Sequence, residues 1–171
     1  TILTLMLTSL AIGTTITASS THWLMAWAGL ELNTLSIIPI ITKHHHPRST
    51  EATTKYFLTQ AAASAMLMFA STTNAWYTGT WDITQLTSPP ACLMFTTAIT
   101  MKLGLAPLHF WLPEVLQGTT LNTALIITTW QKLAPMALMF LTHSSLNPMI
   151  LMTMGLLSAL VGGWGGLNQT Q

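Results

Sequence analysis

Apolar residues fall into six long blocks separated by short polar breaks. The blocks cover approximately residues 2–19, 23–42, 52–73, 91–115, 120–141 and 147–161. A helix of roughly 17 to 25 apolar residues is long enough to cross a hydrocarbon core about 30 Å thick. The pattern therefore predicts an all-α fold: a polytopic transmembrane helix bundle with about six membrane-spanning helices, forming a single domain over residues 1–171.

Prolines interrupt two of these blocks. Pro107 and Pro113 lie in the fourth block, and Pro135 lies in the fifth. Because proline has no N–H to donate inside a helix, we expect the fourth helix to be broken at Pro107 and Pro113. Irregular backbone at membrane depth persists only where protein or water satisfies its polar groups. The break therefore predicts a cavity or a tight protein interface.

Two loops predict the orientation of the bundle. The loop at 43–51 holds two of the five Lys and Arg residues, so the positive-inside rule places it on the cytoplasmic or mitochondrial matrix side. The loop at 74–90 holds three aromatic residues, which are typical of a membrane interface, and we expect it on the opposite side. Six crossings would put both ends of the chain on the side of the basic loop.

Composition agrees with a membrane environment and excludes several classes of function. Only 5% of the residues are Asp, Glu, Lys or Arg, about a fifth of the usual fraction in a soluble domain. The net charge of +1 provides no basic surface for nucleic acid. Cys92 is the only cysteine, so this chain alone cannot form a disulfide or a cysteine-based zinc or iron–sulfur site. We expect no redox cofactor on it.

Three charged residues lie deep inside the apolar blocks. Glu31, Lys102 and Lys132 are about nine, twelve and thirteen residues into their blocks, which corresponds to depths of roughly 13 to 20 Å. A charge at this depth costs about 2.5 to 3.5 kcal/mol or more. The arrangement of lowest free energy turns all three side chains inward, pairs Glu31 with one lysine and leaves the other lysine beside water. We therefore predict that these three residues form a proton relay.

A structural role is the alternative. Glu31 and one lysine would join two helices, while the other lysine would extend along its aliphatic stem toward the interface. Lys55, about four residues inside the third block, can reach the interface in this way, so its position alone favours a structural role. His109, beside the expected break, would either extend the relay or serve as a packing and hydrogen-bonding residue. Lys55 and His109 are therefore secondary site candidates.

Two other motifs do not predict a site. His44, His45 and His46 suggest metal binding, but adjacent residues point in different directions and no carboxylate or cysteine cluster stands at ligand spacing. A solvated loop is favoured there, and we predict no metal site. The glycine-rich run at 162–166 lacks the Lys-Ser/Thr pair of a phosphate loop and is more typical of a turn or a close helix contact.

Five motifs together resemble the antiporter-like proton-pumping subunits of respiratory complex I, and the resemblance covers essentially the whole chain. The most specific motif begins at Lys102 and reads KLGLAPLHFWLPEVLQG. The others, at 29–33, 51–60, 129–135 and 165–171, read GLELN, EATTKYFLTQ, TWQKLAP and GGLNQTQ. The resemblance implies that Glu31 pairs with Lys102, that Lys132 is the central relay group, and that Lys55 belongs to the functional pattern.

The resemblance also implies partners, cofactors and location. The chain would be part of a hetero-oligomer in the lipid bilayer, bound to other membrane-arm subunits, and would couple proton translocation to electron transfer from NADH to ubiquinone. NAD, FMN, iron–sulfur clusters and ubiquinone would be bound by other subunits. The first segment begins near the second relay helix, as in vertebrate mitochondrial forms, which implies a multi-pass protein of the mitochondrial inner membrane.

Two functional alternatives remain open at this stage: a stand-alone cation/proton antiporter and a structural scaffold subunit. The family pattern continues beyond Gln171 into a second set of helices with a further relay lysine. We therefore expect the sequence to be an antiporter-like half, truncated at its C-terminus, that does not assemble a complete proton exit by itself.

Overall fold

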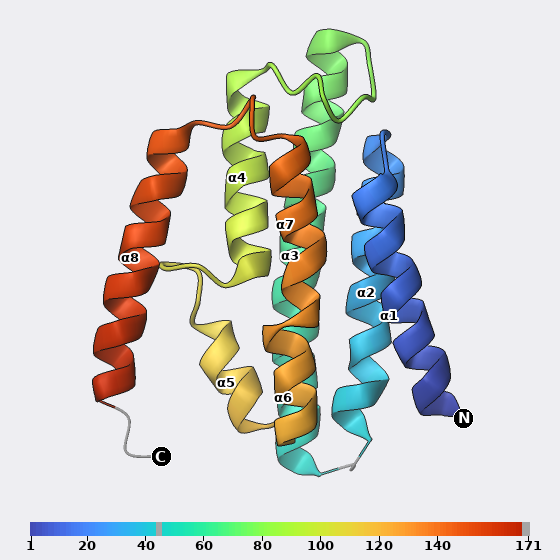
Figure 1. The fold of residues 1–171 in the computed structure, drawn as a ribbon, viewed down its shortest axis with the longest axis vertical. Coiled ribbons are helices and arrows are strands. Elements are labelled where there is room, and N and C mark those ends of the chain that lie inside the picture. Colours follow the sequence, from blue (N-terminus) through green and yellow to red (C-terminus); the bar gives the residue numbers. More distant parts are fainter. Residues whose placement is uncertain (44–45, 169–171) are drawn as a thin grey trace.

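The computed structural model describes residues 1–43 and 46–168, and its described part contains eight helices. They are α1 (Ile2–Ser19), α2 (Trp23–Thr42), α3 (Pro47–Thr78), α4 (Pro89–Leu103), α5 (Trp111–Gln117), α6 (Leu121–Thr128), α7 (Trp130–Leu141) and α8 (Pro148–Leu167). The helices run roughly along one axis (Figure 1). This arrangement confirms the predicted all-α bundle.

The predicted passes through the bundle are all present, but they differ in length, hydropathy and continuity. Four segments are long and apolar enough to cross a membrane: α1, α2, residues 121–141 and α8. The other two passes are α3, which has 32 residues, and the α4–α5 pair. The N-terminus lies at the same end of the bundle as the α2–α3 connection and the C-terminal end of α8 (Figure 1), as the orientation argument predicted.

α3 is longer than its apolar block. It begins with Pro47 in its first turn, where a missing N–H has no cost, and the His46 ring accepts a hydrogen bond from the N–H of Arg48. It ends where Gly79 adopts a left-handed conformation, with φ of 72°. Residues 74–78, which we predicted to lie in a loop, are therefore helical.

The fourth block is broken, but only partly for the predicted reason. α4 ends at Leu103 because Gly104 adopts a left-handed conformation, with φ of 69°, and the N–H of Leu105 donates to the carbonyl of Thr100. Pro107 lies in the irregular segment that follows. Pro113 does not interrupt a helix; it lies in the first turn of α5, where its N–H would have no partner in any case.

The fifth block also divides, at a position that the sequence argument missed. α6 and α7 are separated at Thr129, whose φ and ψ are −106° and −69°, whereas Pro135 lies inside α7. The Thr129 hydroxyl donates to the carbonyl of Leu125, a back-bond that often bends helices. The division places Lys132 in the first turn of α7.

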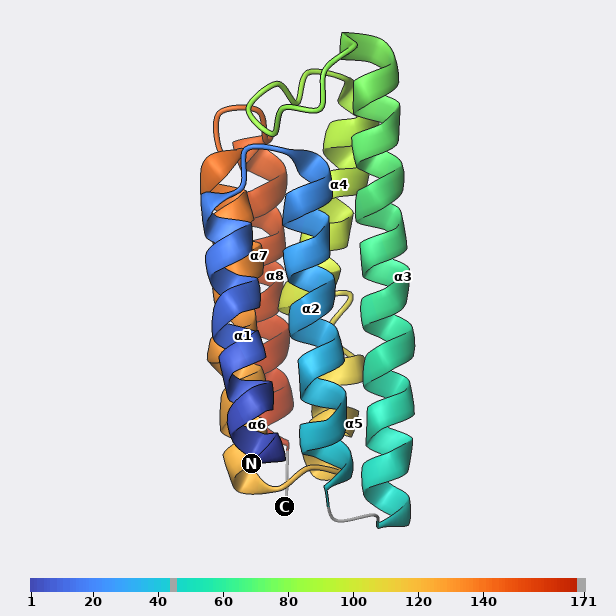
Figure 2. The ribbon, with the colours of Figure 1, turned by 90° about the vertical axis from the view of Figure 1, so that its right-hand side faces the viewer.

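Two apolar cores hold the bundle together, one in each half of its length. One core lies among α2, α3, α4 and α7 and includes Trp23, Leu67, Phe95 and Leu138. The other lies among α1, α2, α3, α5 and α6 and includes Leu10, Ile37, Tyr56, Trp111 and Ile127. Figure 2 shows α3 along one side of both halves, with α5 beside its lower part. The end of α4 and the break after it lie between the two halves (Figure 1).

Candidate functional site

Lys102 and Lys132 line the same small cavity near the break. The cavity has a volume of about 10 Å³, which is room for about one water molecule. Lys102 lies in the last turn of α4 and is only 4% exposed, and its Nζ has no hydrogen-bond partner among the described residues. The other lining residues are Leu30, Thr34, Tyr56, Gln60, Ile127, Gln131 and Pro135.

The broken helix provides the contacts of Lys132. The Lys132 Nζ donates a hydrogen bond to the carbonyl of Leu103, the last residue of α4. In a continuous helix this carbonyl would accept from the residue four positions later, but Pro107 has no N–H. The same Nζ lies 5.4 Å from the centroid of the Trp111 ring, within the range of a cation–π interaction.

Gly104 and Trp111 complete the surroundings of Lys132. Gly104 adopts a left-handed backbone conformation, with φ of 69°, and a Cβ on it would make ordinary contacts of 3.4 Å with the Trp111 ring and 3.5 Å with the Lys132 Nζ. The Trp111 indole N–H donates to the carbonyl of Met101 at 3.1 Å, which satisfies another backbone group of the last turn of α4. Neither residue was predicted from the sequence to have a role.

Glu31 lies close to this cavity but does not line it. Its carboxylate accepts a hydrogen bond of 2.9 Å from the Thr34 hydroxyl, and Thr34 does line the cavity. Glu31 itself lines an open groove between α2 and α3. Within the described residues it forms no ion pair with Lys102 or Lys132, so the predicted pairing is absent from this structure. The Glu31 side chain faces the α2–α3 groove. Its carboxylate is bonded to the Thr34 hydroxyl and not to the lysine ammonium that we predicted.

Polar side chains that the sequence argument did not single out link the helices around the cavity. Tyr56 and Gln60 are one turn apart on α3 and both line it. The Gln131 side-chain N–H donates to the carbonyl of Asn33 at 3.1 Å, which joins α7 to α2 beside Lys132. The spacing of four residues between Tyr56 and Gln60 within an apolar block would have been a usable signal.

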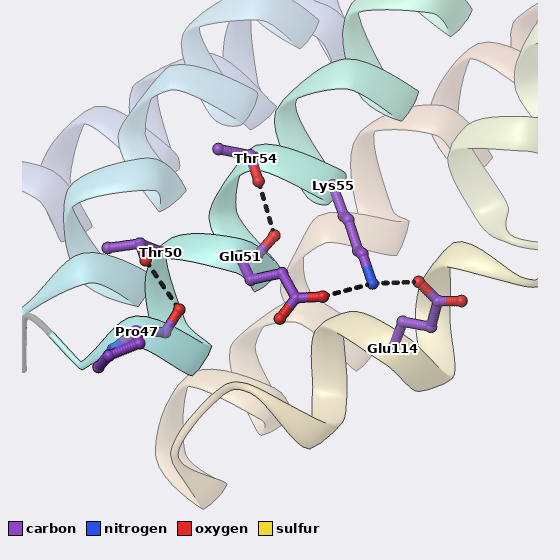
Figure 3. Close-up of polar contacts among 6 residues, drawn as sticks. All are labelled: Pro47, Thr50, Glu51, Thr54, Lys55 and Glu114. Atoms are coloured by element: carbon purple, nitrogen blue, oxygen red, sulfur yellow. Dashed lines mark hydrogen bonds and ion pairs between the residues drawn. The ribbon is translucent and has the colours of Figure 1, made fainter.

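Lys55 lies outside the lysine cavity, in a charged cluster formed by Glu51, Lys55 and Glu114 (Figure 3). Its Nζ is 2.8 Å from a carboxylate oxygen of Glu51 and 2.9 Å from one of Glu114, so the cluster joins α3 to α5. The hydrogen bond from Lys55 holds the pKa of the Glu51 carboxyl below its ordinary value. This contact is therefore present at neutral pH and is lost as the pH falls through that lowered pKa.

The remaining histidine candidates are not joined to the relay. His109 lies in the break and its ring packs on Phe110 at 4.5 Å between centroids. Its Nδ1 is buried without a partner among the described residues, and it does not line the lysine cavity. His44 and His45 lie outside the described residues. Among those described, no group of three or more His, Cys, Asp or Glu side chains could hold a metal ion.

Comparison with known proteins assigns the family. The sequence profile described as NADH:quinone oxidoreductase/Mrp antiporter, TM matches residues 20–171. This chain belongs to that family. The family assignment confirms the resemblance that the motifs indicated and shows that the chain is a multi-pass membrane protein.

Individual relatives agree with this assignment. The chain is 62% identical over 170 residues to NADH-ubiquinone oxidoreductase chain 2 of Carassius auratus and 63% identical over 170 residues to that of Oncorhynchus mykiss. These alignments cover 99% of this chain and 49% of each relative, so the chain spans about half the length of the curated relatives it matches. A chain of respiratory complex I from Thermus thermophilus matches with a TM-score of 0.90 and 28% identity, over 98% of this chain and 40% of that one.

Proposed function

We propose that this chain acts within the membrane arm of respiratory complex I, in the mitochondrial inner membrane, and takes part in proton translocation coupled to electron transfer from NADH to ubiquinone. The observation that carries the proposal is that Lys102 and Lys132 line the same small cavity. Two amines around one water-sized space, at the depth of a broken helix, form a short path on which a proton can pass between them. The family and the named relatives support the same assignment.

In this proposal, Lys132 is the central proton carrier and Lys102 its exchange partner. As an ammonium, Lys132 is stabilised by the Leu103 carbonyl and by the face of Trp111. A proton passes between the two amines through the cavity, which has room for one bridging water. Glu31 acts on the cavity indirectly. A change in its charge alters the hydrogen bond from the Thr34 hydroxyl, and Thr34 lines the cavity. Lys55 and His109 have secondary roles.

The redox chemistry belongs elsewhere in this proposal. Proton transfer through amines, a carboxylate and a hydroxyl changes no oxidation state. NAD, FMN, iron–sulfur clusters and ubiquinone would therefore be bound by other subunits, and this chain would receive their effect as a conformational or electrostatic signal. Its partners would be neighbouring membrane-arm subunits and lipid, in a hetero-oligomer.

The test replaces one amine and measures pumping in the assembled complex. Lys132→Ala should lower the rate of NADH-driven proton translocation into vesicles more than about tenfold, as expected for loss of a positioned proton-transfer group. Lys132→Arg keeps the charge but does not readily release a proton, so it should also fail to pump. Lys43→Ala removes an exposed lysine of the basic loop and is the matched control.

Two outcomes would favour the rival functions. Unchanged pumping by Lys132→Ala, with weaker assembly of the complex, would indicate a scaffold subunit. Cation-dependent proton flux through vesicles that contain only this chain would indicate a stand-alone antiporter, a class that the family name includes.

A further inference from the structure

The charged cluster of Glu51, Lys55 and Glu114 joins α3, which lines the lysine cavity through Tyr56 and Gln60, to α5, whose Trp111 ring lies beside Lys132. We propose that the ion pair between Lys55 and Glu114 controls access of water from the basic-loop end of the bundle to the lysine cavity, by holding α5 against α3. This proposal rests on the proton-translocating function argued above. It assigns to the cluster a role in proton uptake rather than in the exchange between Lys102 and Lys132.

The cluster lies in an open, charged pocket. The pocket has a volume of about 220 Å³ and is lined by Arg48, Glu51, Ala52, Lys55, Glu114, Gln117 and Gly118. The side chains of Lys55, Glu51 and Glu114 are 42%, 64% and 56% exposed, respectively. Exposed ion pairs contribute only about 0 to 1 kcal/mol. The Lys55–Glu114 contact therefore breaks at a small cost in free energy.

An aromatic pair lies where α3 meets α5, beside the lysine cavity. The rings of Tyr56 and Trp111 meet edge to face, with 5.9 Å between their centroids. Both residues are buried; Tyr56 lines the lysine cavity, and the Trp111 ring contacts Lys132. In the proposal, this pair of rings is the apolar barrier between the open pocket and the amines while α5 is packed on α3.

On both helices, the residue of the ion pair lies close along the chain to the residue of the aromatic pair. Lys55 immediately precedes Tyr56 on α3, and Glu114 follows Trp111 by three residues, or about one turn, on α5. α5 has only seven residues and is bounded by the irregular segment at 104–110 and by Gly118, so it can move without displacing a long helix. A movement of α5 away from α3 would separate the ion pair and the aromatic pair together, which would join the open pocket to the lysine cavity.

The experiment measures access to the cavity directly. A cysteine at a cavity-lining position, Gln60→Cys in a Cys92→Ala background, is labelled by a membrane-impermeant thiosulfonate in vesicles of the assembled complex with the basic-loop side outward. Glu114→Gln, which breaks the pair between the helices, should raise the labelling rate about two- to fivefold, the range expected for loss of an exposed ion pair. Glu51→Gln removes the same charge from the same pocket but breaks no bond between α3 and α5, so it should raise the labelling rate less.

A double variant that exchanges the charges of Lys55 and Glu114 tests the proposal even if a single variant folds poorly. Lys55→Glu combined with Glu114→Lys preserves one amine and two carboxylates in the cluster and should return the labelling rate to that of the parent. The proposal is overturned if Glu114→Gln leaves the rate unchanged, or if Glu51→Gln raises it as much. Labelling does not depend on pumping, so the result stands apart from that of Lys132→Ala, which tests the translocating function itself.

Discussion

At the scale of single residues, the surroundings of Lys132 depend on a glycine and a proline. Pro107 leaves the Leu103 carbonyl without a helical donor, and Gly104 ends α4 so that this carbonyl faces Lys132. The C-terminal end of a helix also carries partial negative charge, which stabilises a nearby cation. The break is therefore the source of the contacts that hold the amine.

Gly104→Ala should disturb this arrangement. A side chain at a φ of 69° costs about 1 to 2 kcal/mol, because its Cβ crowds the carbonyl that follows. We expect a lower thermal midpoint of the complex and fewer protons translocated per NADH. Gly155→Ala is the control, because Gly155 lies inside α8 and a Cβ there meets no atom within 4 Å, so this variant should lower neither quantity. Equal effects of the two variants would contradict the role assigned to Gly104.

At the scale of elements, the packing of α5 on α3 is close at Gly118. A Cβ at this position would lie 2.5 Å from the Cβ of Ala52 and 2.7 Å from the carbonyl oxygen of Arg48, and the latter belongs to backbone that cannot easily move. The start of α3 and the end of α5 can therefore approach this closely only with glycine between them.

Gly118→Ala should displace α5 without changing any charge. Overpacking of this kind costs about 1 to 3 kcal/mol, which the structure would relieve by moving the short helix away from α3. The labelling rate of Gln60→Cys should then rise as it does in Glu114→Gln. Gly163→Ala, at a position with open space around it, is the control. A rate that rises with Glu114→Gln but not with Gly118→Ala would mean that charge, and not the position of α5, governs access.

At the scale of the whole molecule, the bundle is unevenly packed. The two apolar cores join α1 to α7, whereas no residue of α8 is buried within the described part of the chain. α8 contacts the core near its start, through Leu151, and stands at one side of the bundle (Figure 1). Stability of the isolated chain should therefore come from α1 to α7.

This uneven packing predicts different effects of the same substitution in two helices. Leu138→Ala, at a fully buried position of α7, should lower the free energy of unfolding of the isolated chain in detergent by about 2 to 5 kcal/mol. Leu156→Ala, at a position of α8 that is 62% exposed, should lower it by less than about 0.5 kcal/mol. Similar losses in both variants, measured by reversible chemical unfolding, would show that α8 packs tightly in solution.

The sequence by itself determined the helical class, the passes through the bundle and the burial of Lys102. These follow from local rules, since hydrocarbon requires long apolar helices and excludes unpaired charge from lipid. It also indicated that the fourth block is broken. It did not locate the ends of that break, because Gly104 and Pro113 act through backbone conformation and position in a turn rather than through residue type alone.

Only the tertiary structure decided which groups meet. The position of Lys132 against Leu103 and Trp111 and the ion pair between Lys55 and Glu114 join different elements, and the absence, within the described residues, of a pair between Glu31 and either lysine of the cavity depends on how the helices pack. Periodicity along a sequence gives the depth of a side chain and its face of the helix. It does not give the neighbour on that face, because the neighbour depends on how the other helices pack.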